Sequence, residues 1–204
     1  MDKIIAIIAN NVYLPNVEIE ARLGVVNLNK FDPDINKDMW ERILNVLGGW
    51  DGWVKTEYSK KEIYMNENIK KNYRTIVNID GEDEFEKKET LVKENFTCSN
   101  SPWDFRVSVS QEFKLSNKII INPDHPTTIS RIKETKSFYH KNWRYDLSSV
   151  TQKLNNCEKQ LYEIEIELWN KETNDPKYLA ADLICKIQDI VNIVENTGQP
   201  LQFS

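Results

Sequence analysis

Glutamate alternates with apolar residues in two segments near opposite ends of this chain. Residues 17–24 read Val-Glu-Ile-Glu-Ala-Arg-Leu-Gly, and residues 162–168 read Tyr-Glu-Ile-Glu-Ile-Glu-Leu. Successive side chains of a β-strand point to opposite faces, so each segment is predicted to be a strand with its glutamates on one face. Acidic residues are depleted in strands, and like charges on one face repel each other. Something must therefore compensate these carboxylates, which are Glu18, Glu20, Glu163, Glu165 and Glu167.

A divalent cation held between the two strands would provide that compensation. Mg²⁺ and Mn²⁺ prefer oxygen ligands, and carboxylates from two neighbouring strands would supply a shared site. The alternative is that both segments belong to a one-sided sheet whose glutamates face water, opposite the apolar residues between them. The basic strands described below favour the metal interpretation.

The bulk properties narrow the classes of protein and partner. A chain of 204 residues is long enough for a single domain covering 1–204. The net charge of −5 argues against binding of nucleic acid through a broad basic surface, and we expect no DNA partner. Three cysteines without a CxxC pair make zinc or disulfide scaffolds unfavourable. The apolar run at residues 4–9 is too short to span a bilayer. We therefore expect a soluble, intracellular protein without a membrane partner.

The order of predicted elements indicates an α+β fold. Apolar spacing predicts helices at 2–10, at 36–47 before Gly48-Gly49, and at 178–194. Between the second and third helices, short segments rich in Val, Ile, Thr, Tyr and Phe predict strands at 54–58, 62–65, 73–79, 88–94, 105–113, 130–139 and 143–147. Turn signals at 80–83, 100–102 and 122–126 separate some of these strands. This order favours a meandering antiparallel sheet or barrel.

Several central strands carry basic residues with the same period of two. One predicted face holds Arg106, Ser108, Ser110 and Glu112, while others hold Arg131, Lys133 and Thr135, or Arg144, Asp146 and Ser148; Arg74 lies in a similar strand. If these faces point to solvent, the pattern is that of ordinary strands. If they point inward with the glutamates, cations and a metal can together bind a compact polyphosphate. A closed barrel with a polar interior and helices covering its apolar outside would accommodate that arrangement.

Taken in order, these motifs resemble the triphosphate tunnel metalloenzymes. The similarity is to the metal-dependent RNA 5′-triphosphatases of fungi, protozoa and large DNA viruses. The segments that carry it are 18–24, Arg74, 104–112, 131–133, 144–148 and 163–167. The resemblance implies an eight-stranded antiparallel β-barrel, the triphosphate tunnel, flanked by a few helices. It also implies the RNA branch of the family, because the Arg-Tyr-Asp-Leu-Ser element at 144–148 is typical of that branch.

The resemblance also implies roles for individual residues. Glu18, Glu20 and Glu167 would bind Mn²⁺ or Mg²⁺, with Glu163 as a possible additional ligand. Glu165 and Asp146 would orient a water bound to the metal, and Glu112 would position or deprotonate the attacking water. The implied phosphate-binding residues are Arg74, Lys88, Arg106, Arg131, Lys133, Arg144 and Ser148. Lys88 is favoured over its neighbour Lys87 for the basic position that follows Asp80-Gly81.

One position departs from the family pattern. Thr135 stands where many relatives carry the second arginine of an Arg-x-Lys-x-Arg sequence, and the adjacent Lys136 has the wrong parity to replace it. Either a bulge re-aims Lys136, or another cation takes over, or the protein functions with one cation fewer.

The function implied by the resemblance is hydrolysis of the γ-phosphate of 5′-triphosphate RNA, the first step of mRNA capping. Hydrolysis of nucleoside triphosphates with Mn²⁺ is expected as well. The alternatives are a tunnel phosphatase acting on thiamine triphosphate or inorganic polyphosphate, and a non-catalytic module that binds phosphorylated ligands. The tail at 198–204 reads like the start of a linker. We therefore expect the N-terminal domain of a longer capping enzyme, with a guanylyltransferase in the same or another chain, in the nucleus or a cytoplasmic viral factory.

Overall fold

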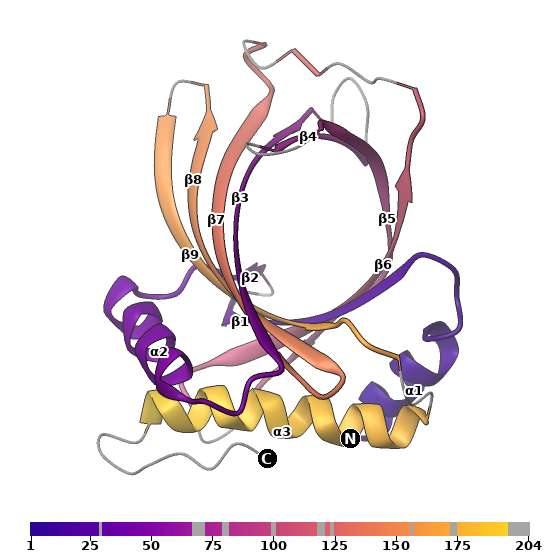
Figure 1. Cartoon of the computed structure of the whole chain (residues 1–204), viewed down its shortest axis with the longest axis vertical. Coiled ribbons are helices and arrows are strands. Elements are labelled where there is room, and N and C mark those ends of the chain that lie inside the picture. The colour runs from indigo at the N-terminus through magenta and orange to yellow at the C-terminus, as the bar shows by residue number, and fades with distance from the viewer. Residues whose placement is uncertain are drawn as a thin grey trace.

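Eight antiparallel strands close into a barrel in the computed structural model of this chain (Figure 1). The structure describes residues 1–28, 30–66, 72–78, 82–98, 101–117, 121–122, 125–155, 157–171 and 175–195. The strands are β1 (Val17–Asn27), β2 (Lys30–Asp32), β3 (Lys55–Met65), β4 (Tyr73–Asn78), β5 (Glu84–Phe96), β6 (Asp104–Lys114), β7 (Ile129–His140), β8 (Trp143–Leu154) and β9 (Cys157–Leu168). The helices are α1 (Asp2–Asn11), α2 (Lys37–Gly49) and α3 (Pro176–Glu195).

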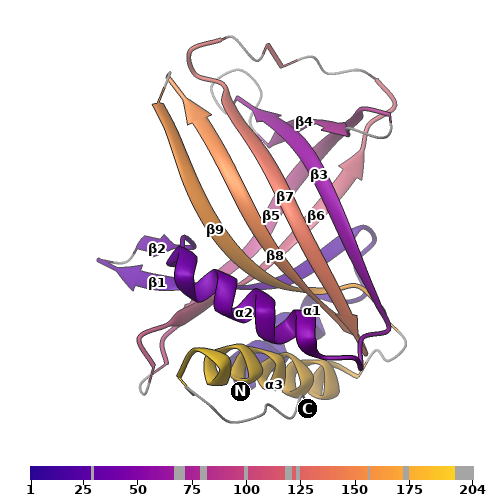
Figure 2. The ribbon, with the colours of Figure 1, turned by 60° about the vertical axis from the view of Figure 1, so that its left-hand side comes forward.

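The barrel is closed by pairing between its first and last strands. The sheet order is β2-β1-β6-β5-β4-β3-β7-β8-β9, and β1 also pairs with β9. The two glutamate strands are therefore neighbours at the closing seam, with Glu20 opposite Glu167 and Arg22 opposite Glu165. Strand β2 lies outside the ring as a short hairpin partner of β1 (Figure 2). Gly24 permits this hairpin, because a Cβ at that position would lie 2.2 Å from the Asp32 carbonyl oxygen.

The hydrophobic core lies outside the barrel, between its lower wall and the helices. Alternation along β1 buries Ile19, Ala21 and Leu23 on the outer face, and Val107 and Val109 do the same on β6. Leu179, Leu183 and Ile190 of α3 belong to the same apolar cluster as these strand residues. Helix α3 runs across the base of the barrel with α1 and α2 beside it (Figures 1 and 2). Because the apolar faces are satisfied outside, the interior remains polar.

The predicted closed barrel and its covering helices are confirmed, but several predicted boundaries were wrong. The segments 54–58 and 62–65 form one strand, β3, because Ser59 and Lys61 face the interior while Lys60 pairs with Glu134 on the other face. The strand predicted at 88–94 begins earlier, at Glu84, and ends at Phe96. The three-residue strand β2 was not predicted.

Other predictions fall partly or wholly outside the described residues. These are the turn signals at 80–83, 100–102 and 122–126, and the tail at 198–204. None of the described helices is long and apolar enough to cross a membrane.

Helix α2 begins at an asparagine cap that can be tested. The Asn36 side-chain oxygen accepts hydrogen bonds from the backbone N–H groups of Asp38 at 2.8 Å and Met39 at 3.4 Å. We expect Asn36→Ala to lower the free energy of unfolding by about 1 kcal/mol, the usual cost of losing such a cap. Urea denaturation measures this loss. Asn45→Ala is the matched control, because Asn45 is exposed in the same helix, and equal stabilities of the two variants would contradict the capping role.

Candidate active site

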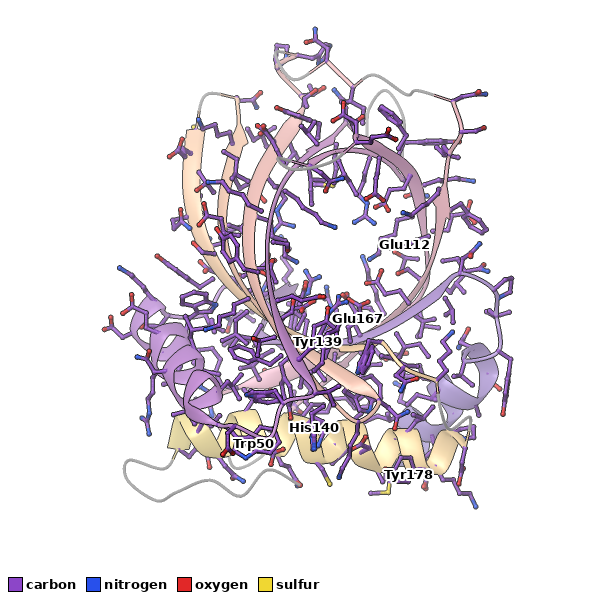
Figure 3. All side chains as sticks on the ribbon, in the orientation of Figure 1. Trp50, Glu112, Tyr139, His140, Glu167 and Tyr178 are labelled. Atoms are coloured by element: carbon purple, nitrogen blue, oxygen red, sulfur yellow. The ribbon has the colours of Figure 1, made fainter. Side chains whose placement is uncertain are left out.

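The barrel encloses a cavity of about 640 Å³ whose wall is densely charged. Among the described residues, nine carboxylates and eight Lys or Arg side chains line it. Figure 3 shows Glu112 on the right-hand wall of the opening and Glu167 on its floor. Alternation along each strand explains this wall, because the residues between the charged ones point outward into the core or to solvent. The cavity is therefore a polar tunnel, as the resemblance implied.

The three predicted metal ligands lie together at the closing seam of the barrel. Glu20 is the direct cross-strand partner of Glu167, and Glu18 follows on the same face of β1. Each is bound by a cation: Glu18 by Lys88 at 2.8 Å and Glu167 by Arg144 at 2.5 Å, while Arg22 lies 3.4 Å from Glu20. In the described part of the chain, no three metal-binding side chains already converge on one point.

The donor set at this seam nevertheless fits a hard divalent cation. Burial raises the pKa of Glu18 well above its usual value; the hydrogen bond with Glu112 and the charges of Glu20 and Glu167 also raise it, while Lys88 lowers it. Burial also raises the pKa of Glu167 to about 7, and Asp146, Glu165 and Glu20 add to the effect. Carboxylates that resist ionisation because they are buried and lie near other carboxylates are stabilised by a cation between them. Glu18, Glu20 and Glu167 are thus suited to Mg²⁺ or Mn²⁺, which prefer oxygen ligands.

Glu112 has the opposite electrostatic character. Arg74 donates to its carboxylate at 2.7 Å, and the Lys88 ammonium lies 2.9 Å away. Burial acts to raise the pKa of Glu112, but the hydrogen bond with Glu18 and the charges of Lys88 and Arg74 hold it well below its usual range. The Glu112 side chain is therefore ionised at neutral pH and can accept a proton or a hydrogen bond from water.

Glu165 on β9 and Asp146 on the neighbouring strand β8 are each held by cations. Glu165 forms ion pairs with Arg22 and with Lys133, the latter at 2.7 Å. Burial acts to raise the Glu165 pKa, but Arg22 and Lys133 outweigh it and lower the pKa far below its usual range. Asp146 accepts from Ser137 at 2.6 Å and from Arg144 at 2.8 Å. These contacts fix the direction of both carboxylates.

Five of the predicted phosphate-binding residues line the tunnel: Arg74, Lys88, Arg131, Lys133 and Arg144. Lys88 rather than Lys87 faces inward, since Lys87 forms an ion pair with Glu89 instead. The Nε atoms of Arg22, Arg74 and Arg131 are buried without a hydrogen-bond partner among the described residues. Buried donors normally have partners, so these three are available for the oxygens of an anionic ligand.

The other three predicted site residues lie apart from the main tunnel lining. Arg106 lines an adjacent pocket of about 290 Å³, where its Nε donates to Asn95 at 2.8 Å and its guanidinium lies over the Phe31 ring. Ser148 is fully buried, with its oxygen 2.9 Å from that of Thr135. Glu163 is also buried and pairs with Arg131 at 2.6 Å. Their roles in ligand binding stay predictions.

Sequence reasoning missed Arg22 and Glu86, which both line the tunnel. Arg22 continues the period of Glu18 and Glu20 on β1 and forms ion pairs with Glu165 and Glu20. Glu86 forms an ion pair with Arg74 from the neighbouring strand. The alternation of faces along β1 could have identified Arg22, because it shares a face with Glu18 and Glu20. Glu86 lay in a stretch that was not predicted as strand.

Comparisons with known proteins agree with this geometry. The sequence profile of the family described as mRNA capping enzyme, beta chain, matches residues 29–198. The chain belongs to this family. Among its sequence relatives is the 5′ RNA triphosphatase A449R of Paramecium bursaria Chlorella virus 1, which is 27% identical over 157 residues, or 76% of each chain.

Solved structures with the same fold include two RNA triphosphatases. The Pct1 RNA triphosphatase of S. pombe superposes with a TM-score of 0.75 at 17% identity, covering 93% of this chain and 91% of that one. The RNA triphosphatase domain of a trifunctional mimivirus mRNA capping enzyme gives a TM-score of 0.68 at 19% identity, covering 93% and 95%. The predicted tunnel fold of the capping-enzyme triphosphatases is therefore confirmed for this chain.

Proposed function

We propose that this chain hydrolyses the γ-phosphate of 5′-triphosphate RNA, leaving a 5′-diphosphate end and orthophosphate, the first step of mRNA capping. The observation that carries the proposal is the closed polar tunnel, in which a carboxylate seam faces cations from the other strands. Membership in the mRNA capping enzyme beta chain family supports the choice of RNA as substrate. The triphosphatase relative from a chlorella virus supports the reaction.

The residues of the tunnel can carry out this reaction mainly by electrostatics. In phosphoryl transfer, negative charge spreads over the equatorial oxygens, so fixed cations stabilise the transition state. Arg74, Lys133 and Arg144 are held in place by ion pairs and would contact those oxygens. Glu112, ionised and fixed by Arg74 and Lys88, would align the attacking water by accepting a hydrogen bond from it.

The proposed cofactor is Mn²⁺ or Mg²⁺, held by Glu18, Glu20 and Glu167. When bound, the cation supplies positive charge that offsets the phosphate oxygens. Glu165 and Asp146 would orient water at this site, because their own cations fix their direction. Nucleoside triphosphates are proposed as further substrates, and a guanylyltransferase domain in the same or another chain would take up the diphosphate end. The proposed location is where that partner works, in the nucleus or a cytoplasmic viral factory.

The proposal is tested by release of labelled γ-phosphate from triphosphate-ended RNA. Parallel reactions contain Mg²⁺, Mn²⁺ or a chelator, and the RNA is compared with ATP, thiamine triphosphate and inorganic tripolyphosphate. We expect metal-dependent release, with a higher kcat/KM for RNA than for thiamine triphosphate or tripolyphosphate. The reverse preference would point to a phosphatase of small polyphosphates. Failure of the folded, metal-supplied protein to release phosphate from any of these would indicate a non-catalytic phosphate-binding module.

A further inference from the structure

Thr135 leaves the tunnel wall without a charge at a position where a basic residue was expected. Its side chain faces the tunnel, and its hydroxyl oxygen lies 2.9 Å from that of Ser148. Thr135 is only 6% exposed, and its hydroxyl forms a hydrogen bond with the Ser148 hydroxyl at the wall of the cavity. Any substitute cation must therefore come from another position.

Lys136 is not that substitute. Strand β7 pairs without interruption with β3 on one side and β8 on the other, so no bulge turns Lys136 inward. The Lys136 ammonium lies 5.3 Å from the centroid of the Phe138 ring, and the residue is exposed. The possibility that a bulge re-aims Lys136 is therefore wrong.

Lys61 on the neighbouring strand faces the tunnel beside this gap. On the β3–β7 ladder, Ser59 lies opposite Thr135 and Lys61 lies opposite Lys133. Lys61 is thus the diagonal neighbour of Thr135 on the same face, within reach of a long side chain. Both Lys61 and Thr135 line the cavity.

Lys61 differs from the other cations of the described tunnel wall in its ion pairing. The other tunnel-lining cations each have a carboxylate partner: Arg22 and Lys133 with Glu165, Arg74 with Glu112, Lys88 with Glu18, Lys114 with Glu84, Arg131 with Glu163, and Arg144 with Glu167. Lys61 forms no such ion pair with the described residues. The hydrogen bond with Lys114 is the first cause that lowers the pKa of Glu84, and the charge of Lys61 contributes less than Lys114 or Asn78 does.

Lys61 lies directly opposite Lys133 on the β3–β7 ladder. Like charges opposite each other on neighbouring strands destabilise a sheet. Such a cost is expected where a binding site is built, because an anion between the two ammonium groups turns the repulsion into attraction. A polyphosphate in the tunnel would provide that anion.

We infer that Lys61 is a phosphate-binding residue of the tunnel and supplies the positive charge that Thr135 lacks. The inference rests on the proposed function, because the ligand is the triphosphate of that substrate. Lys61 then adds a contact from β3, a strand from which sequence reasoning identified no site residue. The phosphate chain is held from β3 as well as from β7 and β8.

The test compares Lys61→Met with Lys60→Met, a matched control one residue away. Lys60 points to the outer face, where it pairs with Glu134 at 2.5 Å. Two quantities are measured for each protein: the Kd of inorganic tripolyphosphate with chelator present, and kcat/KM for γ-phosphate release from RNA. We expect Lys61→Met to weaken both about ten- to a hundredfold, the range for loss of one charged hydrogen-bond partner, and Lys60→Met to change neither. Lys61→Arg should retain both.

Adding Thr135→Arg to Lys61→Met is the decisive rescue. A charge restored from β7 should recover part of the lost affinity and activity if the two positions serve the same phosphate chain. Equal behaviour of Lys61→Met and Lys60→Met in both measurements would overturn the inference while leaving the triphosphatase intact. If the wild type binds tripolyphosphate through Lys61 but hydrolyses no triphosphate, the proposed function fails and the binding role stands.

Discussion

Glu167→Gln is expected to abolish γ-phosphate release while leaving the metal-free protein as stable as the wild type, or more stable. The activity should fall about a thousandfold, since charge stabilisation by a bound metal is worth several kcal/mol. Stability follows from the folded-state pKa of about 7, raised by burial and then by Asp146, Glu165 and Glu20 against the attraction of Arg144. The ionised carboxylate is thus an unfavourable group in the fold, and glutamine removes its charge while keeping its shape.

The stability advantage of this variant should depend on pH. The pKa of Glu167 rises from 4.5 to about 7 on folding, so the folded protein binds more protons at this residue than the unfolded chain does. The advantage of glutamine is therefore fully present above pH 7 and disappears as the pH falls towards 4.5. Thermal unfolding of the metal-free proteins across this range measures it, with a shift of about 2–4 °C for each kcal/mol.

Added Mn²⁺ separates metal binding from catalysis in the same experiment. A ligand that binds only the folded state raises the melting temperature, so Mn²⁺ should stabilise the wild type and should not stabilise Glu167→Gln. Glu158→Gln is the matched control, because Glu158 lies on the same strand but is exposed and paired with Lys153. The assignment of Glu167 as a ligand is wrong if the glutamine variant hydrolyses RNA normally or gains as much stability from Mn²⁺ as the control.

The face to which the glutamates of β1 and β9 point was predictable from the sequence, because side chains alternate between the two faces of any strand. Glu18, Glu20 and Glu167 share the inner face for the same reason that Ile19 and Ile166 share the outer face. The residue pattern alone allowed either an open sheet or a barrel, and the resemblance to the tunnel enzymes implied the closed barrel that the structure has.

The partners across the tunnel could not be predicted in this way. Which carboxylate meets which cation depends on the register of strands far apart in sequence, as in the ion pair between Arg22 and Glu165. The role of Lys61 could not be predicted either, because it also depends on which strands pair. Its polar neighbours looked like a break between two strands, although pairing with β7 continues through them.

Glu165→Gln is expected to lose activity as completely as Glu167→Gln but, in contrast, to destabilise the fold. Glu165 is the shared ion-pair partner of Arg22 and Lys133, and all three side chains are largely buried. Their attraction outweighs burial and holds the Glu165 pKa far below its usual range, so the ionised form stabilises the folded state. Removing one partner of a buried pair leaves an uncompensated charge and costs about 3–5 kcal/mol. Urea unfolding at neutral pH measures this loss against Glu167→Gln.

The double variant Lys133→Met with Glu165→Gln identifies the cause of that loss. Methionine removes one of the two cations that lost their partner, so part of the lost stability should return while γ-phosphate release stays absent. The two carboxylates would then have distinct tasks: Glu165 holds the cations of the tunnel in place, and Glu167 is a carboxylate whose ionised form a metal would stabilise. Equal stability of Glu165→Gln and Glu167→Gln would contradict this division, because their opposite pKa directions require opposite effects on folding.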